Sequence, residues 1–262
     1  MAKGRLTTDS KTICPTCRDS GWLVKNLNSV EKAVACPDCH SRNQSVKLLN
    51  NAKIPPRYFD RDFDEFPPTT RLRERALRRC IDFVETFPEA ARGLLLVGPC
   101  GVGKTHLSAS ILKALIREKM ISGRFVDETE FLRRIQYSYG PDSRETEREV
   151  LFPLLHVDLL VWDDLGTGRP TEWVAETIRT VLNHRYTYSK HTILSTNLQI
   201  QSTKKTGLPI KSNSLVEKIG MGLFSRIMEM CEVVDIDGPD FRTDIHKAGL
   251  DFKEKTQNSQ TK

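Results

Sequence analysis

A glycine-rich turn followed by a lysine and a threonine is the stretch of this chain with the clearest chemical meaning. It reads Gly98-Pro99-Cys100-Gly101-Val102-Gly103-Lys104-Thr105. This is the spacing of a phosphate-binding loop, in which backbone N–H groups turn toward an anion at the positive end of the next helix. Lys104 is expected to reach the β- and γ-phosphates of a nucleotide, and the Thr105 hydroxyl to hold Mg²⁺. An ordinary glycine turn is the alternative, but the apolar run before the loop and the helical pattern after it favour a phosphate site. Nucleotide contacts are therefore expected from Gly98, Pro99, Cys100, Gly101, Val102, Gly103, Lys104, Thr105 and His106.

Two carboxylates follow a second apolar run, Leu159-Leu160-Val161-Trp162, and they are Asp163 and Asp164. At the end of a strand, Asp163 is expected to hold Mg²⁺, directly or through water, opposite Thr105. Asp164 is expected to face the γ-phosphate and to polarise the attacking water. A strand followed by a solvated acidic turn is the alternative. Asn197 follows a third apolar run and could orient the water or sense the γ-phosphate, although asparagine is also a common turn residue.

Four cysteines near the N-terminus form two C-x-x-C pairs separated by eighteen residues. This spacing fits a zinc site made of four thiolates, Cys14, Cys17, Cys36 and Cys39. Between the pairs, residues 21–24 and 33–35 could form a small hairpin. A piece of about fifty residues with so few large apolar side chains needs a metal to fold. Disulfides are the alternative, but they are rare in the cytosol. We expect a structural Zn²⁺, with His40 outside its ligand set.

Composition limits the classes of protein to which this chain can belong. Its 262 residues are 38% hydrophobic and 28% charged, which suits one or two globular domains. The net charge is +6, and residues 1–57 carry all of the excess, with ten Lys and Arg against four Asp and Glu. This excess permits contact with nucleic acid but does not require it. No apolar run reaches membrane-spanning length and no secretion signal is present, so the cytoplasm is the expected location.

The elements that must position these residues alternate between strand and helix. The double proline at 55–56 predicts that residues 41–57 are a linker, and a helix is expected over 70–87. Strands are then expected at 93–98, 123–128, 158–163, 191–196 and 231–237. Helices are expected at 104–120, 129–138, 145–156, 172–187 and 214–230. This alternation predicts an α/β fold with a five-stranded parallel sheet covered on both faces. The domain organisation expected is a zinc module at 1–50, a linker and first helix at 51–92, an ATPase core at 93–246 and a flexible tail at 247–262.

Four segments together resemble the initiator-type AAA+ ATPases, and within them the bacterial replicative helicase loaders of the DnaC/DnaI kind. The segments are GPCGVGKT, LLVWDDLG, NHRYTYSKHTILSTNL and LFSRIMEMCEVVDIDGPDFR. The resemblance covers about residues 54–242 and begins at Ile54-Pro55-Pro56-Arg57-Tyr58. IstB-type transposition ATPases share nearly all of these motifs, so the core does not separate the two groups well. The zinc module favours the loaders, because DnaI-like loaders grip the helicase with such a module, whereas IstB-type proteins usually begin with a helical segment.

The resemblance also implies roles for single residues. Asn197 corresponds to the first sensor, and Arg226 to an arginine finger that reaches the γ-phosphate of a neighbouring subunit. Hydrolysis would then require an oligomer; an arginine on a helix surface is the alternative for Arg226. Asp164 stands where many AAA+ enzymes have Glu, which withdraws the carboxylate by about 1.5 Å and favours slow turnover. Arg242 lies in a segment, Gly-Pro-Asp-Phe-Arg, that resembles the closing motif of the family.

The function expected is an ATP-dependent helicase loader with ATP, Mg²⁺ and Zn²⁺ as cofactors. It would bind a replicative helicase through residues 1–50, bind single-stranded DNA, and self-associate through its ATPase domains. Salt-sensitive phosphate contacts are expected from basic side chains, and base stacking from tyrosines, unless these residues serve only as a solvated face or as packing. The candidates are Arg133, Arg134, Lys204, Lys205, Lys211, Tyr137 and Tyr139. The alternatives are a transposition helper that remodels target duplex DNA and a nucleotide-dependent adaptor without significant hydrolysis.

Overall fold

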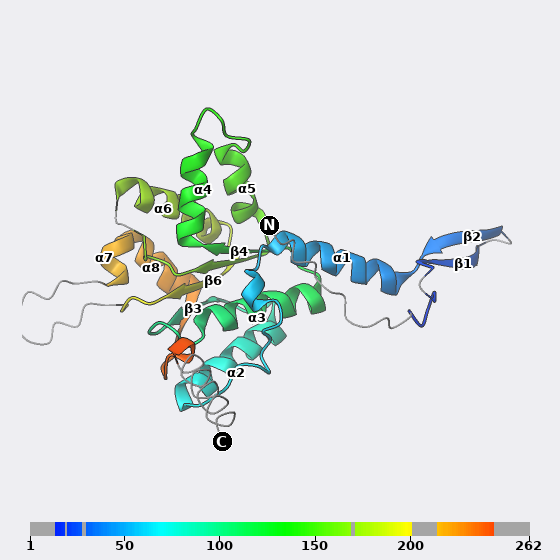
Figure 1. Cartoon of the computed structure of the whole chain (residues 1–262), viewed down its shortest axis with the longest axis horizontal. Coiled ribbons are helices and arrows are strands. Elements are labelled where there is room, and N and C mark those ends of the chain that lie inside the picture. Colours follow the sequence, from blue (N-terminus) through cyan, green and yellow to red (C-terminus); the bar gives the residue numbers. More distant parts are fainter. Residues whose placement is uncertain (1–13, 19, 28–29, 169–170, 201–213, 244–262) are drawn as a thin grey trace, which may run out of the picture.

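A five-stranded parallel sheet forms the centre of the protein in the computed structural model shown in Figure 1. The structure describes residues 14–18, 20–27, 30–168, 171–200 and 214–243. The strand order across the sheet is β4-β5-β6-β3-β7. The strands are β3 (Gly93–Val97), β4 (Gly123–Asp127), β5 (Leu159–Asp163), β6 (His191–Thr196) and β7 (Cys231–Asp235). The predicted α/β class and five-stranded parallel sheet are confirmed.

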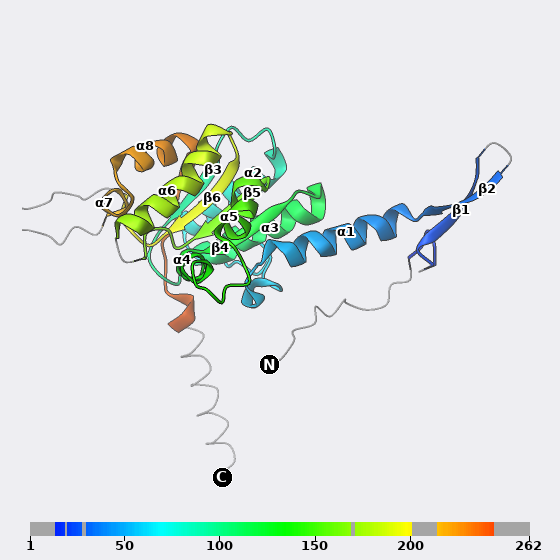
Figure 2. The ribbon, with the colours of Figure 1, turned by 90° about the horizontal axis from the view of Figure 1, so that it is seen from above.

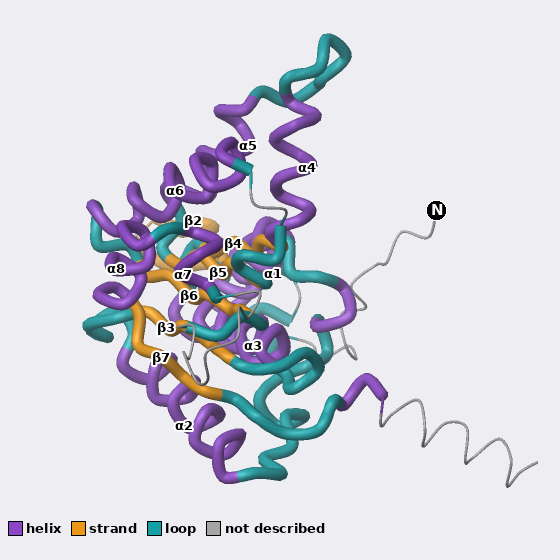
Figure 3. The backbone as a smooth tube through the Cα atoms, turned by 90° about the vertical axis from the view of Figure 1, so that its left-hand side faces the viewer, coloured by secondary structure: helices purple, strands orange, loops and turns teal. Residues whose placement is uncertain are grey.

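Helices cover both faces of the sheet. The helices of this body are α2 (Arg71–Thr86), α3 (Lys104–Lys119), α4 (Glu128–Ser138), α5 (Glu147–His156), α6 (Glu172–Thr187), α7 (Leu215–Ile219) and α8 (Met221–Met230). Figures 1 and 3 show α2 and α3 on one side of the strands and α4, α5 and α6 on the other. Successive strand residues face opposite layers, so Leu94 and Leu96 pack in the layer that contains α3, whereas Leu95 packs in the layer that contains α6. Burial on both faces explains why the strands are continuous apolar runs.

The last predicted helix, 214–230, is two helices. Gly220 separates α7 from α8 and has a φ of +83°, a backbone conformation that glycine adopts without steric cost. The N–H of Gly220 still bonds to the carbonyl of Val216 at 2.8 Å, and its own carbonyl accepts the N–H of Phe224 at 3.0 Å. The chain therefore changes direction at one residue without losing its backbone hydrogen bonds.

The N-terminal part consists of a hairpin and a long helix. Strands β1 (Trp22–Leu27) and β2 (Val30–Ala35) pair antiparallel, and α1 (Pro37–Ala52) follows them. Figures 1 and 2 show α1 leading away from the sheet and carrying the hairpin at its far end. The prediction of a linker over 41–57 was wrong for most of that range, because α1 occupies it through residue 52.

Packing explains why a polar segment is helical here. Leu48, Leu49 and Ala52 of α1 pack against the apolar layer of the sheet, and Ala52 is fully buried. The helix ends at Ala52 and is followed by Lys53, which has a φ of +56° and lies two residues before the double proline. A single turn of 3₁₀ helix follows at Pro56–Tyr58. Among the described residues, no helix is both long enough and apolar enough to cross a membrane.

Candidate functional site

The glycine-rich loop joins the buried strand β3 to the first turn of α3, as a phosphate-binding loop does. Gly103 precedes α3 with a φ of +101°, which is accessible only to glycine without strain. Val102 is fully buried in the apolar layer and holds the loop to the body, whereas Cys100 is exposed. The carbonyl of Gly101 accepts the N–H of Phe241 at 3.2 Å, so the segment after β7 lies against the loop.

Lys104 is the first residue of α3, and its ammonium group is largely buried. Its Nζ donates to the carbonyls of Gly98 and Pro99 at 2.8 and 2.7 Å, and to Oδ1 of Asn197 at 2.5 Å. Burial lowers the pKa of Lys104, because desolvation disfavours the charged form. The lysine that the sequence assigns to phosphate binding therefore lies beside the amide assigned to the sensor.

Asp163 ends β5 with its carboxylate buried between two hydroxyl groups. Thr105 Oγ1 donates to Oδ2 of Asp163 at 2.9 Å, and the hydroxyl of Ser195 donates to Oδ1. Burial, with the charge of Asp164 adding to it, raises the pKa of Asp163 to about 6. Among the described residues, Asp163 forms no ion pair with a lysine or arginine. A carboxylate and a hydroxyl at this spacing fit Mg²⁺, which prefers oxygen ligands and is usually bound by one or two carboxylates together with phosphates.

Asp164 follows in the left-handed backbone region, with a φ of +57°. Its N–H donates to Oγ of Ser195 at 3.0 Å, and its Oδ1 accepts Nδ2 of Asn197 at 3.0 Å. The orientation of the Asn197 amide follows from chemistry, since Lys104 can only donate and an ionised Asp164 can only accept. Ser195 and Asn197 are both at the end of β6, so neighbouring parallel strands bring these groups to one edge of the sheet.

A cavity of about 190 Å³ lies beside this cluster, and a segment from before the sheet forms one of its walls. We call this segment, residues 57–67, the strap. The cavity is lined by Arg57, Tyr58, Arg61, Glu65, Phe66 and Pro67 of the strap, by Arg73, by loop and α3 residues, and by Asp164, Asn197, Phe241 and Arg242. The site thus combines the glycine-rich loop with a cavity next to it.

The strap is held to α3 by hydrogen bonds. Lys113, which is 1% exposed, donates to the carbonyls of Tyr58, Phe59 and Arg61 at 2.6–3.1 Å and pairs with the carboxylate of Asp62 at 2.6 Å. The predicted nucleotide contact His106 instead donates from Nε2 to the carbonyl of Asp62 at 2.7 Å, although its ring also lines the cavity.

Arg73 of α2 connects the strap to the segment after β7. Its guanidinium lies 4.5 Å from the ring centroid of Phe66 and 4.0 Å from that of Phe241. Nε donates to the carbonyl of Pro67 at 3.0 Å, and Nη1 has no hydrogen-bond partner among the described residues. Burial lowers the pKa of this guanidinium. Two aromatic rings therefore hold a buried cation at the wall of the cavity.

Arg226 lies apart from these residues, on the exposed face of α8. Its Nη1 donates to Oδ1 of Asn183 at 2.5 Å, and its guanidinium lies 5.8 Å from the ring centroid of Tyr186. It does not line the cavity of its own chain. This position is compatible with contact to another subunit.

The expected nucleic-acid contacts lie partly on α4. Arg133, Tyr137 and Tyr139 are exposed, whereas Arg134 is engaged by Glu145, to whose Oε2 its Nε donates at 2.7 Å. Figures 1 and 3 show α4 and α5 projecting from the body with their connecting loop at the tip. The other predicted contacts, Lys204, Lys205 and Lys211, lie outside the described residues.

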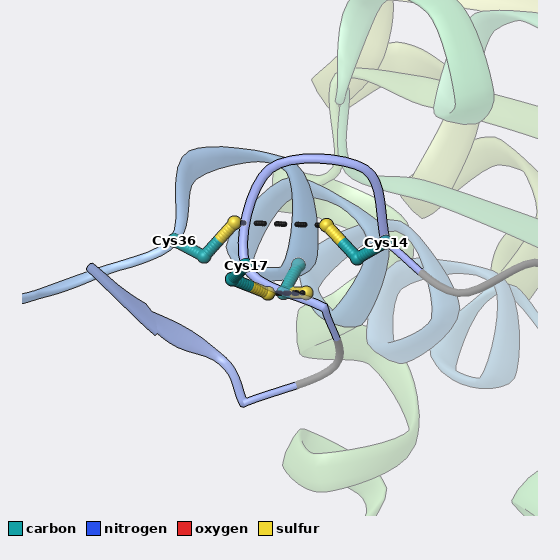
Figure 4. A group of neighbouring side chains, drawn as sticks. Cys14, Cys17 and Cys36 are labelled. Atoms are coloured by element: carbon teal, nitrogen blue, oxygen red, sulfur yellow. Dashed lines mark hydrogen bonds between the residues drawn. The ribbon is translucent and has the colours of Figure 1, made fainter.

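The four N-terminal cysteines form a second site. The sulfur atoms of Cys14 and Cys36 are 3.8 Å apart, those of Cys17 and Cys39 are 3.3 Å apart, and all four lie within 4.8 Å of one another. Figure 4 shows Cys14, Cys17 and Cys36 converging just before α1 begins. In the described part of the chain, no two cysteines are joined by a disulfide. Zn–S bonds of about 2.3 Å in a tetrahedron place sulfurs about 3.8 Å apart, so this set fits zinc.

Several residues that shape the site were not identified from the sequence. They are Ser195, Lys113, Arg73 and Glu128. Ser195 was visible only as part of the polar end of a strand. The resemblance identified the start of the strap as a stretch that precedes the ATPase core, but it did not predict that the strap lies beside the glycine-rich loop.

Comparison with known proteins agrees with this geometry. Residues 18–248 match the family described as IstB-like ATP binding protein. The phage-like element PBSX protein XkdC of Bacillus subtilis is 24% identical over 230 residues, covering 85% of this chain and 80% of that protein. The replicative helicase loader DnaC of Escherichia coli is 23% identical over 167 residues, covering 62% of this chain and 67% of that protein. A crystal structure of the DnaC helicase loader superposes with a TM-score of 0.59 and 33% identity, covering 70% of this chain and 99% of that chain. This chain therefore belongs to the family of IstB-like ATP binding proteins.

Proposed function

We propose that this protein is an ATP-dependent loader of a replicative helicase that uses ATP binding and hydrolysis as a switch. The observation that carries the proposal is the contact chain from Lys104 through Asn197 to Asp164. One amide touches both the group expected to bind the γ-phosphate and the group expected to activate water. Such an arrangement can make hydrolysis depend on the state of the phosphates.

The residues of the site divide the chemistry between them. Thr105 and Asp163 would hold Mg²⁺, which supplies charge stabilisation on the phosphates when it is bound. Asp164 would accept a hydrogen bond from the attacking water, and Asn197 would fix the direction of that carboxylate. The loop N–H groups would bind the phosphates, and the cavity under the strap would hold the rest of the nucleotide.

Self-association is part of the proposal because of Arg226. The side chain is exposed and lies outside the cavity of its own chain, which supports a role at the nucleotide of a neighbouring subunit. A guanidinium supplied in this way stabilises the charge that develops on the transferred phosphoryl group. Hydrolysis would then depend on assembly.

The choice of partners rests on the relatives and on the cysteine cluster. The similarity to helicase loaders supports a helicase as the bound protein. The β1–β2 hairpin lies at the end of α1 that points away from the sheet (Figure 2), which supports docking through this part of the chain. The exposed Arg133 and Tyr137 on the projecting α4 support contact with single-stranded DNA.

The family match supports a second candidate, a transposition helper that remodels duplex target DNA. The two functions differ in the form of DNA that they require and in the partner protein. A loader is expected to prefer single strands and to bind a hexameric helicase, whereas a transposition helper is expected to form ATP-dependent assemblies on duplex DNA.

The proposal is tested with the full chain in the presence of Zn²⁺. ATP binding and ATP turnover are measured without DNA, with a single-stranded oligonucleotide and with the corresponding duplex. A separate experiment asks whether the protein captures the replicative helicase of the same host. Lys104→Ala should abolish ATP binding, and Lys47→Ala, at an exposed position on α1, should not. Capture of the helicase together with preference for single strands supports the loader. Preference for duplex without capture supports the transposition helper, and absence of turnover under every condition leaves the nucleotide-dependent adaptor.

A further inference from the structure

Glu128 is a buried carboxylate that no part of the proposed chemistry uses. It is the first residue of α4 and has no exposed surface. Among the described residues, no lysine or arginine forms an ion pair with it. A carboxylate in such a place must receive hydrogen bonds or lose its charge, and burial does raise the pKa of Glu128.

The groups that donate hydrogen bonds to Glu128 come from residues before and after Asp163 and Asp164 in the chain. Oε2 accepts the N–H of Gly166 at 2.8 Å and Nε1 of Trp162 at 3.3 Å, while Oε1 accepts the N–H of Gly168 at 2.9 Å. Trp162 immediately precedes Asp163 in the chain, and Gly166 comes two residues after Asp164. One side chain therefore ties down the segments on either side of the acids.

The loop that Glu128 holds has an unusual shape at its start. Asp164 has a φ of +57°, and the carbonyl of Asp164 accepts both the N–H and the hydroxyl of Thr167, at 3.2 and 2.8 Å. Leu165 donates its N–H to the carbonyl of Ser195 at 2.8 Å, which fixes the strand side of the turn. Glu128 fixes the far side, through the two glycine N–H groups.

We propose that Glu128 is a positioning residue for hydrolysis. It holds residues 166–168 so that Asp164 keeps the backbone conformation in which its carboxylate meets Asn197. Because Glu128 belongs to α4, the placement of this loop follows the placement of the projecting helix. This inference rests on the proposed hydrolysis of ATP.

The test compares Glu128→Gln with Glu130→Gln, an identical change at an exposed position two residues further along α4. The amide that replaces the carboxylate of Glu128 has the same size but presents N–H donors where a backbone N–H now donates, so the loop loses one of its acceptors. We expect kcat to fall about tenfold or more, since small displacements of a catalytic group have large effects, while the affinity for ATP stays unchanged. Glu130→Gln should leave both quantities unchanged.

Gly168→Ala gives a second, independent variant, because its Cβ would lie 3.1 Å from Oε1 of Glu128 and would push the carboxylate away. Gly168→Ala should also lower kcat more than the affinity for ATP. If the Glu128→Gln variant does not fold, the kcat of Gly168→Ala tests the inference in its place. Wild-type kcat in a folded Glu128→Gln protein overturns the inference, and so does a loss of ATP affinity that parallels the loss of kcat. Absence of turnover in the wild-type protein would instead remove the proposed hydrolysis, and this inference with it.

Discussion

Asn197 joins Lys104 to Asp164 through the two ends of one amide. Its oxygen accepts the lysine ammonium at 2.5 Å, and its nitrogen donates to the carboxylate at 3.0 Å. A γ-phosphate that binds to Lys104 competes with the amide oxygen for the same donors. Any movement of the amide then alters its bond to Asp164. The sensing role proposed for Asn197 thus has a direct physical basis in shared hydrogen bonds.

Replacement of Asn197 by alanine should reduce turnover far more than nucleotide binding. The variant keeps the loop N–H groups and Lys104, so we expect the affinity for ATP to remain largely intact. Loss of the group that orients Asp164 should lower kcat by about ten- to a hundredfold. Steady-state hydrolysis and calorimetric titration measure the two quantities, with Asn50→Ala on the exposed face of α1 as the control. An equal loss of binding and turnover would mean that Asn197 only supports the loop.

Features with a local signature were predictable from the sequence. The apolar runs at β3 and β5 are buried on both faces, and a loop of fixed spacing follows β3, so residue types and spacing alone predicted these two strands and the loop. The cysteine pairs were predictable for the same reason, because four ligands of one metal leave a regular spacing.

Features that depend on tertiary contacts were not predictable. Glu128 is held by backbone N–H groups some forty residues away, and Arg73 lies between the nearby ring of Phe66 and the ring of Phe241 near the other end of the chain. Such contacts leave no pattern in the neighbouring sequence. Helix α1 is polar on average and is fixed by the burial of Ala52 near its end. In each case packing overrides local propensity.

Removal of zinc should unfold the N-terminal hairpin and leave the sheet intact. Among the described residues, the hairpin has little core of its own beyond the cysteines and Leu23, so we expect its folding to depend on the metal. We expect Cys14→Ser to abolish zinc binding and to expose the backbone N–H groups of residues 22–27 to hydrogen exchange, while ATP binding persists. Metal analysis and exchange mass spectrometry report these effects. Cys100→Ser, at an exposed thiol in the loop, should keep one zinc per chain. Retention of exchange protection without zinc would contradict the structural role.

Replacement of Arg226 by alanine should abolish turnover without weakening ATP binding, because the side chain is outside the cavity of its own chain. Mixing Arg226→Ala with Lys104→Ala should restore part of the activity. A subunit that cannot bind ATP still carries an intact Arg226 for its neighbour. Arg179→Ala, which removes an exposed arginine of α6, is the control. Full activity of Arg226→Ala at all protein concentrations would exclude a role between subunits.

The strap offers a matched comparison, because Lys113 and Arg117 both pair with Asp62 but differ in burial. Lys113 is 2% exposed in its side chain and donates to three strap carbonyls as well, whereas Arg117 is 45% exposed and forms the ion pair at 2.8 Å. Lys113→Met removes one donor from each of these strap carbonyls and the buried partner of Asp62, so we expect a loss of about 2–4 kcal/mol in the free energy of unfolding. Arg117→Met should cost less than about 1 kcal/mol, since exposed ion pairs contribute little.

The same pair of variants tests whether the strap contributes to nucleotide binding. Tyr58 and Arg61 line the cavity, and Lys113 holds the carbonyls of both. We therefore expect Lys113→Met to weaken ATP binding even under conditions in which the protein remains folded, and Arg117→Met to leave binding nearly unchanged. Denaturant titrations give the stabilities and calorimetry gives the affinities. Equal effects of the two substitutions on both measurements would show that the carbonyl contacts of Lys113 contribute nothing beyond the ion pair, and that the strap does not depend on them to form the wall of the cavity.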